Sequence, residues 1–348
     1  MDLIDRAVIG WDIGGVQSKY AALGPGGIPV GKGCLPFEVW KGPDGLDQVL
    51  RDLASGINSP GHALMAVTMT AELCDCFQTK KEGVLFVLDS FRRSFPSNPV
   101  WCVSGNGEWK TLEEALSFPA RFAATNWRPA ATWLARKLGS CLWVDTGSTT
   151  TDIIPLVDGV PVPIGGTDTD RLAHGELVYT GVIRSNPNAL AYQVPVKGSM
   201  CRVADERFCS MGDCYLILGD IEAFSYSVST CDGRPADVPH ALSRLARLVC
   251  SDSENMDMHG ATLMATFLRE RQILAITEAM LQVCSRFDFS LPVICTGAGK
   301  FLATEAARRV GLREKDLSEI IPEGYETQLP AYTAAAELLL MVEEGILK

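Results

Sequence analysis

Apolar and polar residues alternate along the chain in short blocks, and two of the blocks share one plan. Residues 8–23 (VIGWDIGGVQSKYAAL) and 141–157 (CLWVDTGSTTTDIIPLV) each hold an apolar run, an Asp, a Gly two positions later, small polar residues and a second apolar run. Apolar arms joined by Gly, Ser or Thr are typical of β-hairpins. The sequence therefore predicts two hairpins, with turns that begin at Asp12 and Asp145, 133 positions apart. Two such hairpins indicate two lobes of similar topology.

Other short apolar runs predict further strands. These strands are expected at 64–70, 84–89, 100–104, 214–218 and 292–296. The segment from Asn126 to Pro129 predicts the start of a helix that reaches Leu138 and ends at Gly139 and Ser140. Because the second hairpin follows at once, we place a domain boundary near residue 140.

Two longer segments have the spacing of helices. Over 261–284, apolar residues recur near 3.6 residues per turn at Leu263, Phe267, Leu274 and Leu281. Over 331–344, apolar residues form one stripe along a predicted helix. The side chains of Glu337, Glu343 and Glu344 are expected to lie outside this stripe. Strands that alternate with helices indicate an α/β fold class.

The composition is that of a chain that buries a large core. Its 348 residues are enough for two domains, and 47% of them are hydrophobic against 21% charged, which excludes disorder as the main state. A net charge of −11 argues against a nucleic-acid partner. Small phosphorylated ligands remain compatible with this charge, because backbone N–H groups and a bound cation can hold them.

The beginning of the sequence does not look like a leader. Met1 to Arg6 already carries Asp2 and Asp5, and no apolar stretch of 18 residues occurs. We therefore expect a cytoplasmic protein with no membrane partner. In that compartment the 12 cysteines should be reduced thiols without a disulfide framework. Cys74 and Cys76 lack further ligands at the spacing of a zinc site, so they too are expected to be buried thiols.

Three glycine-rich segments could carry chemistry. The first is Asp12-Ile-Gly14-Gly15, the second is Asp145-Thr-Gly147-Ser148-Thr149, and the third is Gly297-Ala-Gly299. Glycine lets the backbone approach an anion closely, and a nearby Asp can hold a divalent cation against that anion. An Asp-x-Gly or Gly-x-Gly segment taken alone is more often an ordinary turn, since Asp and Gly are common there. The occurrence of all three in one chain favours phosphate binding.

In this order, the three segments resemble the phosphate and adenosine segments of the superfamily that includes acetate and sugar kinases, heat-shock 70 chaperones and actin. The resemblance implies two ribonuclease-H-like lobes, in an actin-like ATPase fold, that face each other across a cleft. The first lobe would comprise residues 1–140 together with 331–348, and the second would comprise 141–330. Fold alone says little about the reaction.

A closer resemblance rests on three stretches, 66–77 (AVTMTAELCDCF), 143–154 (WVDTGSTTTDII) and 175–181 (GELVYTG). They look like the hydantoinase/oxoprolinase-related proteins of the tetrahydromethanopterin-linked one-carbon transfer pathway. The resemblance runs from about residue 8 to residue 344. It implies a Mg²⁺-dependent synthase of methanofuran or methylofuran biosynthesis. Such an enzyme joins an aminomethylfuran-methyl diphosphate to the phenol oxygen of a glutamyl-tyramine or tyrosine type acceptor and releases diphosphate.

The resemblance also implies roles for individual residues. Asp12 and Asp145 would hold Mg²⁺, and Asp168, Glu72 or Asp145 would do the catalytic work, with Asp168 or Glu72 as the base. Phosphate would be bound by Gly14, Gly15, Gly147, Ser148, Thr149, Gly297 and Gly299. Substrate contacts would come from Thr167, Arg171 and Glu176, while Glu206 and Asp213 match family residues on a following helix. The partners would be small molecules, namely the phosphorylated furan and the phenolic acceptor, and a homodimer is compatible with the sequence.

Two other function classes stay open at this point. One is an ATP-dependent phosphotransferase or an ATP-dependent amidohydrolase, which the superfamily and the name of the group suggest. The other is a nucleotide-gated binding protein without turnover, as in the chaperone and actin relatives. His62 and His174 lie near the segments of interest, but a lone histidine is more often structural.

Overall fold

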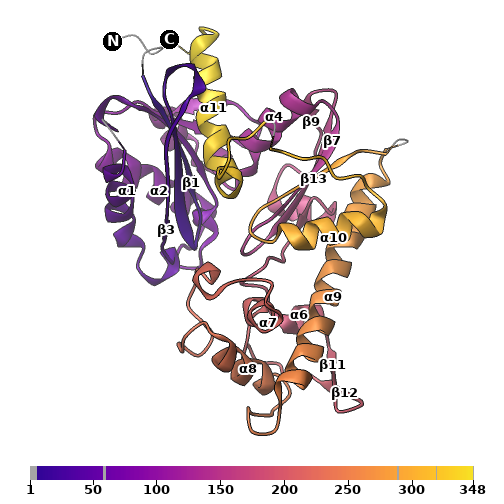
Figure 1. The fold of residues 1–348 in the computed structure, drawn as a ribbon. Helices are drawn as coiled ribbons and strands as arrows, with labels where there is room; N and C mark the ends of the chain where they lie inside the picture. Colours follow the sequence, from indigo (N-terminus) through magenta and orange to yellow (C-terminus); the bar gives the residue numbers. More distant parts are fainter. Residues whose placement is uncertain (1–5, 58–59, 288–289, 319, 348) are drawn as a thin grey trace.

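The strands of the chain form two main sheets with helices packed around them (Figure 1). The computed structural model describes residues 6–57, 60–287, 290–318 and 320–347. Most of the segment Met1 to Arg6, where we expect no leader, lies outside the described residues.

The first sheet has six strands in the order β3-β2-β1-β4-β5-β6. Their bounds are β1 (Val8–Ile13), β2 (Gln17–Leu23), β3 (Pro29–Pro36), β4 (Leu64–Met69), β5 (Val100–Val103) and β6 (Trp109–Thr111). β1 pairs antiparallel with β2 and parallel with β4. The helices α1 (Leu46–Ser55), α2 (Lys80–Ser94) and α3 (Leu112–Ser117) pack around this sheet, and α4 (Trp127–Leu138) leads to the second one.

The second sheet is smaller and has the order β10-β8-β7-β13, with β9 paired to β8. Its strands are β7 (Cys141–Thr146), β8 (Thr151–Val157), β9 (Val160–Pro161), β10 (Leu177–Val178) and β13 (Val293–Thr296). α5 (Asp168–Ala173) precedes β10, and α10 (Lys300–Val310) follows β13. Since β13 runs parallel to β7, the ends of the two strands bring Thr296 opposite Asp145.

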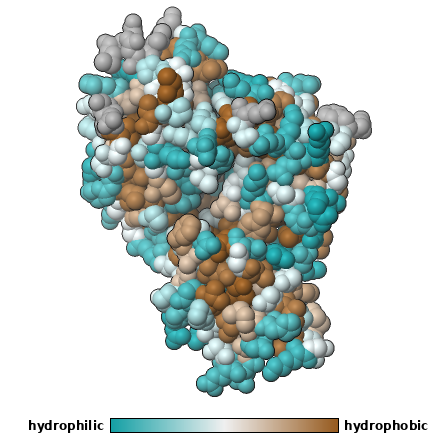
Figure 2. Space-filling view, viewed as in Figure 1, coloured by the Kyte–Doolittle hydropathy of each residue, from teal (hydrophilic) through white to brown (hydrophobic). Residues whose placement is uncertain are grey.

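A mostly helical part is inserted between β10 and β13 and extends away from the two sheets (Figure 1). It contains α6 (Pro187–Leu190), the hairpin of β11 (Gln193–Val196) and β12 (Ser199–Arg202), α7 (Met211–Leu218), α8 (Val238–Arg247) and α9 (Met258–Cys284). The long helix α9 connects this part back to the second sheet. In the view of Figure 2, apolar residues gather over α7, whereas hydrophilic residues cover much of the surface above it.

Both predicted hairpins are confirmed, and their turns close in the same way. The N–H of Gly14 donates to the carbonyl oxygen of Gln17 at 3.0 Å, and the N–H of Gly147 donates to that of Thr150 at 2.8 Å. Each bond therefore joins the residue two positions after the Asp to the residue five positions after it. The strands expected at 64–70, 100–104 and 292–296 are also confirmed, as is the helix that ends at Leu138.

Two predicted strands are wrong, because both segments are helical. Residues 84–89 lie inside α2, whose N-terminus is capped by Thr79, and residues 214–218 lie inside α7, which begins with a capping box of Ser210 and Asp213. A short apolar run is compatible with a buried strand or a buried helix, because it shows no periodicity of its own. Here the capping residues that precede each run favour the helix. The helix predicted over 261–284 is confirmed, but Leu263, Leu274 and Leu281 are exposed, since α9 buries the neighbouring face.

The C-terminal helix α11 (Leu329–Glu343) packs against β1, β2 and β4 of the first sheet and against α4. The contact with β1 is so close that a Cβ on Gly10 would lie 1.9 Å from the carbonyl oxygen of Ala331. The expectation that Glu337 lies outside the apolar stripe is wrong, because its side chain is buried at the contact with α4. Arg136 on α4 reaches it, with Nη1 3.1 Å from Oε2, and its charge offsets part of the cost of burying this carboxyl group.

The core formed by the described residues is divided into three clusters. One lies within the first sheet and α1 to α3, and another joins the second sheet to α7, α8, α9 and α10. The third contains residues of both sheets together with α4 and α11. All 12 cysteines lie in the described part of the chain and are free thiols, but the expectation that Cys74 and Cys76 are buried is wrong, since Cys74 is half-buried and Cys76 is exposed. Within the described part of the chain, no helix combines the length and the hydropathy that crossing a bilayer requires.

Candidate active site

A cleft of about 850 Å³ lies between the two sheets and is lined by residues from both. It brings together most of the residues predicted from the sequence, namely Asp12, Gly14, Gly15, Glu72, Asp145, Gly147, Ser148, Thr149, Asp168, Arg171 and Gly297. The three glycine-rich segments, far apart in the sequence, therefore meet in one place. Thr167, Glu176 and Gly299 are not among the described residues that line it.

Asp12 and Asp145 stand at equivalent positions of the two hairpins, but they face different neighbours. Asp12 pairs across the strands with Lys19, whereas Asp145 pairs with Asp152. Asp12 is buried, and its Oδ1 has no hydrogen-bond partner among the described residues. Burial raises the pKa of Asp12, the Lys19 charge opposes this rise, and the Asp152 charge adds to it. A buried carboxylate oxygen without a partner suits a ligand that supplies positive charge.

Asp145 is oriented by a hydrogen-bond chain. The indole N–H of Trp143 donates to Thr296 Oγ1 at 2.9 Å, and the Thr296 hydroxyl donates to Asp145 Oδ1. Burial raises the pKa of Asp145 to about 6; the Thr296 bond opposes the rise, and the charges of Asp152 and Asp12 reinforce it. Our sequence prediction missed Thr296, although its place at the end of an expected strand was a usable signal.

Glu72 is almost fully buried in a short 3-10 turn, Ala71–Leu73, that follows β4. The backbone N–H of Ala124 donates to its Oε1 at 2.8 Å, while Oε2 has no partner among the described residues. Burial raises the pKa of Glu72 to about 7, and the hydrogen bond from Ala124 opposes this rise. Helix α2 supports the turn closely, since a Cβ on Gly83 would lie 2.5 Å from Glu72 Cα.

Asp168 and Arg171 belong to a set of ion pairs. Lys80 Nζ, from the first sheet's side of the cleft, lies 3.0 Å from Asp168 Oδ2, and Arg171 Nη1 lies 3.9 Å from Oδ1. Arg171 is buried and donates to Asp152 Oδ1 at 2.5 Å, with its guanidinium over the Trp127 ring. Asp168 is thus paired with cations, whereas Glu72 keeps an oxygen without a partner in the described chain.

The three predicted residues outside the lining have structural contacts. Thr167 caps α5. Glu176 accepts hydrogen bonds from the N–H groups of Ile164 and Gly165 and from Arg286, so it holds the loop before α5. Gly299 packs against Thr146, where a Cβ would lie 2.5 Å from Thr146 Cγ2.

Close backbone packing shapes the glycine turns. Gly297 has a φ of +88°, and a Cβ there would lie 2.3 Å from the carbonyl oxygen of Thr146. Gly181 packs directly on the loop of Ser148 and Thr149, where a Cβ would lie 2.4 Å from the Thr149 nitrogen. Neither position accepts a side chain without moving the loops that face the cleft.

Our sequence prediction missed the cations and the aromatic residues of the cleft, among them Lys19, Trp40, Trp127, Arg184 and Arg207. It also missed a loop of the helical part that contributes Val228, Ser229, Thr230 and Cys231. Of these residues, only Lys19 could have been predicted from the sequence, because it stands opposite Asp12 in the predicted hairpin. The others do not belong to a recognisable motif.

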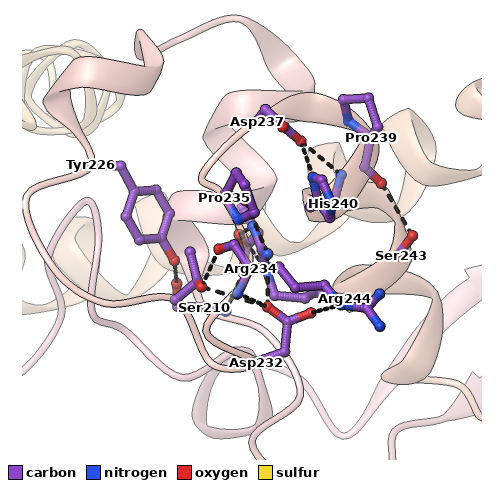
Figure 3. A network of polar contacts seen from close by, with 12 residues as sticks. Ser210, Tyr226, Asp232, Arg234, Pro235, Asp237, Pro239, His240, Ser243 and Arg244 are labelled. Carbon is purple, nitrogen blue, oxygen red and sulfur yellow. Dashed lines mark hydrogen bonds and ion pairs between the residues drawn. The ribbon is translucent and has the colours of Figure 1, made fainter.

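The loop at residues 228–231 is held in place by hydrogen bonds and ion pairs centred on Arg244 (Figure 3). Arg244 on α8 donates to Asp232 Oδ1 at 3.0 Å and to buried Asp213 at 2.7 and 2.9 Å, and Tyr226 meets Ser210. Asp213 therefore supports the loop by binding Arg244. Glu206, the other residue that matches the family, is exposed.

Two carboxylates fit a divalent cation better than the cysteines do. Among the described residues there is no cluster of three or more His, Cys, Asp or Glu side chains that could hold a metal by themselves. Mg²⁺, however, is usually bound by one or two carboxylates together with water and substrate phosphates. The buried Asp12, which has an unpartnered oxygen in the described chain, and the half-buried Asp145, whose pKa the Asp12 charge helps to raise, match that donor set.

The family model for hydantoinase/oxoprolinase proteins matches residues 64–336, which is most of the chain. The chain belongs to the hydantoinase/oxoprolinase family. Within it, the chain is 33% identical over 300 residues to the (4-{4-[2-(gamma-L-glutamylamino)ethyl]phenoxymethyl}furan-2-yl)methanamine synthase of Methanocaldococcus jannaschii, covering 86% of this chain and 88% of that one. A synthase of the same name from Methanococcus vannielii is 34% identical over 167 residues, covering 48% of this chain and 74% of that one. This family member is accordingly an enzyme.

Its fold matches that of a solved structure of acetone carboxylase, described as acting by ATP-dependent acetone carboxylation. The TM-score is 0.56 at 10% sequence identity, and the match covers 94% of this chain and 70% of that one. At this identity the likeness concerns the fold only. The family member thus has the α/β, actin-like ATPase fold that the resemblance of its three glycine-rich segments implied.

Proposed function

We propose that the protein is a Mg²⁺-dependent synthase that forms an aryl ether during methanofuran or methylofuran biosynthesis. It would join an aminomethylfuran-methyl diphosphate to the phenol oxygen of a glutamyl-tyramine or tyrosine type acceptor. The bond between the furan-methyl carbon and the diphosphate oxygen breaks, the bond from that carbon to the phenol oxygen forms, and the phenol proton is released. The observation that carries this proposal is the 33% identity to the M. jannaschii synthase along 88% of that enzyme.

The end of the cleft that contains Asp12 and Asp145, called the acidic end below, suits binding of the diphosphate leaving group. Asp12 and Asp145 would hold Mg²⁺, and the backbone N–H groups of Gly15, Ser148 and Thr149 would bind the diphosphate, since those of Gly14 and Gly147 close the turns. When bound, Mg²⁺ neutralises charge that develops on a leaving diphosphate. Lys19, whose charge acts on both Asp12 and Asp145, supplies a further cation at this end.

The environment of Glu72 suits removal of the proton from the phenolic acceptor. A phenol has a pKa of about 10 in water, so it needs a base to become a nucleophile at neutral pH. Burial gives Glu72 a pKa of about 7, and its Oε2 has no partner in the described chain, so the ionised form has a free site for the phenol proton. We therefore propose Glu72 as the base in preference to Asp168, whose carboxylate is paired with Lys80.

The proposal is tested by incubating the protein with Mg²⁺, the furan-methyl diphosphate and γ-glutamyltyramine. We expect the ether in the mass spectrum and one diphosphate released per ether formed. Titration calorimetry should show Mg²⁺-dependent binding of diphosphate and negligible binding of ATP. Absence of the ether, or micromolar ATP binding accompanied by ATP turnover, would favour the phosphotransferase or amidohydrolase alternative instead.

A further inference from the structure

The backbone of Arg184 is bonded to the turn of the second hairpin, which contains Ser148. The N–H of Arg184 donates to the carbonyl oxygen of Ser148 at 2.9 Å, and the N–H of Ile183 donates to the same oxygen at 3.0 Å. One residue earlier, the N–H of Val182 donates to the carbonyl oxygen of Gly147 at 3.0 Å. The segment that carries Arg184 is therefore fixed directly on one of the two turns that we assign to the diphosphate.

The side chain of Arg184 reaches a residue that is held by the turn of the first hairpin, which contains Gly15. Its guanidinium carbon lies 4.5 Å from the centre of the Trp40 ring. Trp40 belongs to the 3-10 turn Val39–Lys41, and the N–H of Val39 donates to the carbonyl oxygen of Gly15 at 3.0 Å. Gly15, Trp40 and Arg184 all line the cleft. Short contacts thus connect Arg184 to the turns of both hairpins.

Cys74 places the charge of Arg184 close to the turn of the first hairpin. A Cβ on Gly15 would lie 2.8 Å from Cys74 Sγ, so this thiol lies directly against the turn. Burial raises the pKa of Cys74 to about 11, and the Arg184 charge opposes that rise. Lys19, in contrast, is the cation that acts on Asp12 and Asp145 at the acidic end. Arg184 therefore supplies positive charge on another side of the turns.

Arg184 lacks the counter-ion that other arginines around the cleft have. Arg171 pairs with Asp152, and Arg244 pairs with Asp213. In the part of the chain that the structure describes, no carboxylate lies within ion-pair distance of Arg184, although its side chain is half-buried. Stacking on an aromatic ring fixes the plane of a guanidinium and leaves its N–H groups free for an anion. A phosphate group suits a cation in this position, beside backbone N–H groups of two glycine turns.

We propose that Arg184, stacked on Trp40, binds the diphosphate of the furan substrate between the turns of the two hairpins. The inference rests on the proposed function and adds a side-chain cation to a site otherwise built from backbone N–H groups and Mg²⁺. A guanidinium donates two parallel hydrogen bonds to phosphate oxygens. Negative charge on the diphosphate increases as its bond to the furan-methyl carbon breaks, so Arg184 should also stabilise the leaving group. Trp40 is a positioning residue that acts through Arg184.

The test measures diphosphate binding without turnover. Titration calorimetry with inorganic diphosphate, in excess Mg²⁺, compares the wild-type protein with variants of Arg184. Arg184→Gln should weaken the binding of diphosphate at least about tenfold, the effect of losing charge-assisted hydrogen bonds. Arg184→Lys keeps the charge without the planar fork, so its affinity should lie between those of the wild type and Arg184→Gln.

Arg202→Gln is the matched control. Arg202 also stacks on an aromatic ring, that of Tyr192, but it is not among the described residues that line the cleft. This variant should bind diphosphate as the wild type does. The assignment is overturned if the wild type does not bind diphosphate, or if Arg184→Gln binds it with wild-type affinity.

Trp40 is tested by a double-mutant cycle. Trp40→Leu should weaken diphosphate binding about two- to fivefold, the usual contribution of a cation–π contact at a partly exposed site. In the background of Arg184→Gln the same substitution should have no further effect, since Trp40 acts through the guanidinium. An equal loss in both backgrounds would show that Trp40 supports only the fold, and it would contradict the positioning role.

Turnover separates this inference from the proposed function. Arg184→Gln should lower kcat/KM for the furan-methyl diphosphate at least about tenfold and leave the KM for the phenolic acceptor within about twofold. A loss confined to the acceptor would contradict the assignment. Diphosphate binding that depends on Arg184, without ether formation by the wild type, would refute the reaction and leave the diphosphate site standing. Ether formation with diphosphate binding that is independent of Arg184 would refute the inference and leave the reaction standing.

Discussion

Glu72 shows how burial changes the chemistry of a single residue. Its sequence neighbours, Ala71 and Leu73, do not distinguish it from any other glutamate, but the structure removes it from water and lets backbone N–H groups, that of Ala124 among them, donate to its carboxylate. Its pKa therefore rises to about 7, close to the pH at which a base is most useful.

Glu72 should control the pH dependence of the reaction. Only ionised Glu72 accepts the phenol proton, so kcat should rise with pH and level off above about 7. Replacement by Gln should lower kcat by about 10² to 10⁴, the usual contribution of a general base, and remove the rising limb. The measurement is kcat against pH for wild type, Glu72→Gln and Asp168→Asn. If Asp168→Asn loses the limb and Glu72→Gln keeps it, the two roles are reversed.

Asp145 should control the response to Mg²⁺. Asp145→Asn removes a charge from the proposed metal site, so half-maximal activity should need at least about tenfold more Mg²⁺, since one charged ligand is worth a kcal/mol or more. The readout is activity and diphosphate binding as a function of Mg²⁺ concentration. Asp158→Asn, an exposed aspartate at the turn after β8, is the control and should behave as wild type. An unchanged Mg²⁺ response in Asp145→Asn would rule out its role as a ligand.

Among the helices and strands, turn residues predict the local structure more specifically than short apolar runs do. The two hairpins could be predicted because an Asp-x-Gly turn, flanked by apolar arms, specifies its own geometry. Residues 84–89 and 214–218 could not, because each is a short apolar run that either a strand or a helix can bury. In both cases the deciding residues, Thr79 and Ser210, stand before the run and cap the helix. The two errors share this cause.

The glycine turns depend on packing between elements as well as on their own sequence. Gly181→Ala would place a Cβ 2.4 Å from the Thr149 nitrogen, so the loop of Ser148 and Thr149 must move. We expect weaker diphosphate binding and a loss of about 1–3 kcal/mol in the free energy of unfolding, as for an overpacked site. Calorimetric titration and denaturant unfolding measure the two effects.

Gly166→Ala serves as the control for this change, because the nearest atom to a Cβ at that position is 4.0 Å away. It should alter neither quantity appreciably. Wild-type diphosphate binding in Gly181→Ala would mean that the Ser148 loop does not contact the diphosphate.

At the scale of the whole molecule, α4 and α11 join the two sheets. Their buried residues belong to the cluster that also contains Val8 and Leu64 of the first sheet and Trp143 and Ile294 of the second. The chain therefore returns at its C-terminal helix to the sheet where it began. Glu337 lies within this contact, buried, with Arg136 as its partner and with Oε1 lacking one in the described chain.

Glu337 should make the stability of the protein depend on pH. Burial raises its pKa from 4.5 to about 7, and the Arg136 charge opposes that rise. Because the folded protein keeps this proton at pH values where the unfolded chain releases it, the free energy of unfolding should fall as the pH rises from about 4.5 to about 7. The contribution of Glu337 should be about 1–3 kcal/mol.

The measurement is denaturant unfolding across this pH range for wild type and Glu337→Gln. The variant cannot release a proton, so its free energy of unfolding should fall less with pH than that of the wild type. Glu343→Gln, at an exposed position of the same helix, should keep the wild-type slope. Equal slopes in all three proteins would show that Glu337 does not titrate in this way.

The parts of this protein that neighbouring residues specify could be predicted from its amino-acid sequence. These are the two Asp-x-Gly hairpins, the helices predicted up to Leu138, over 261–284 and over 331–344, and, from short matching stretches, the family and the residues of the glycine turns. Three features became known only from the folded chain: which carboxylates are buried, that Glu176 supports a loop instead of lining the cleft, and that Arg184 contacts Trp40. The physical reason is that a turn depends on neighbours in the chain. A pKa, an ion pair or a cleft depends on groups brought together from distant segments, and no local pattern records which groups those will be.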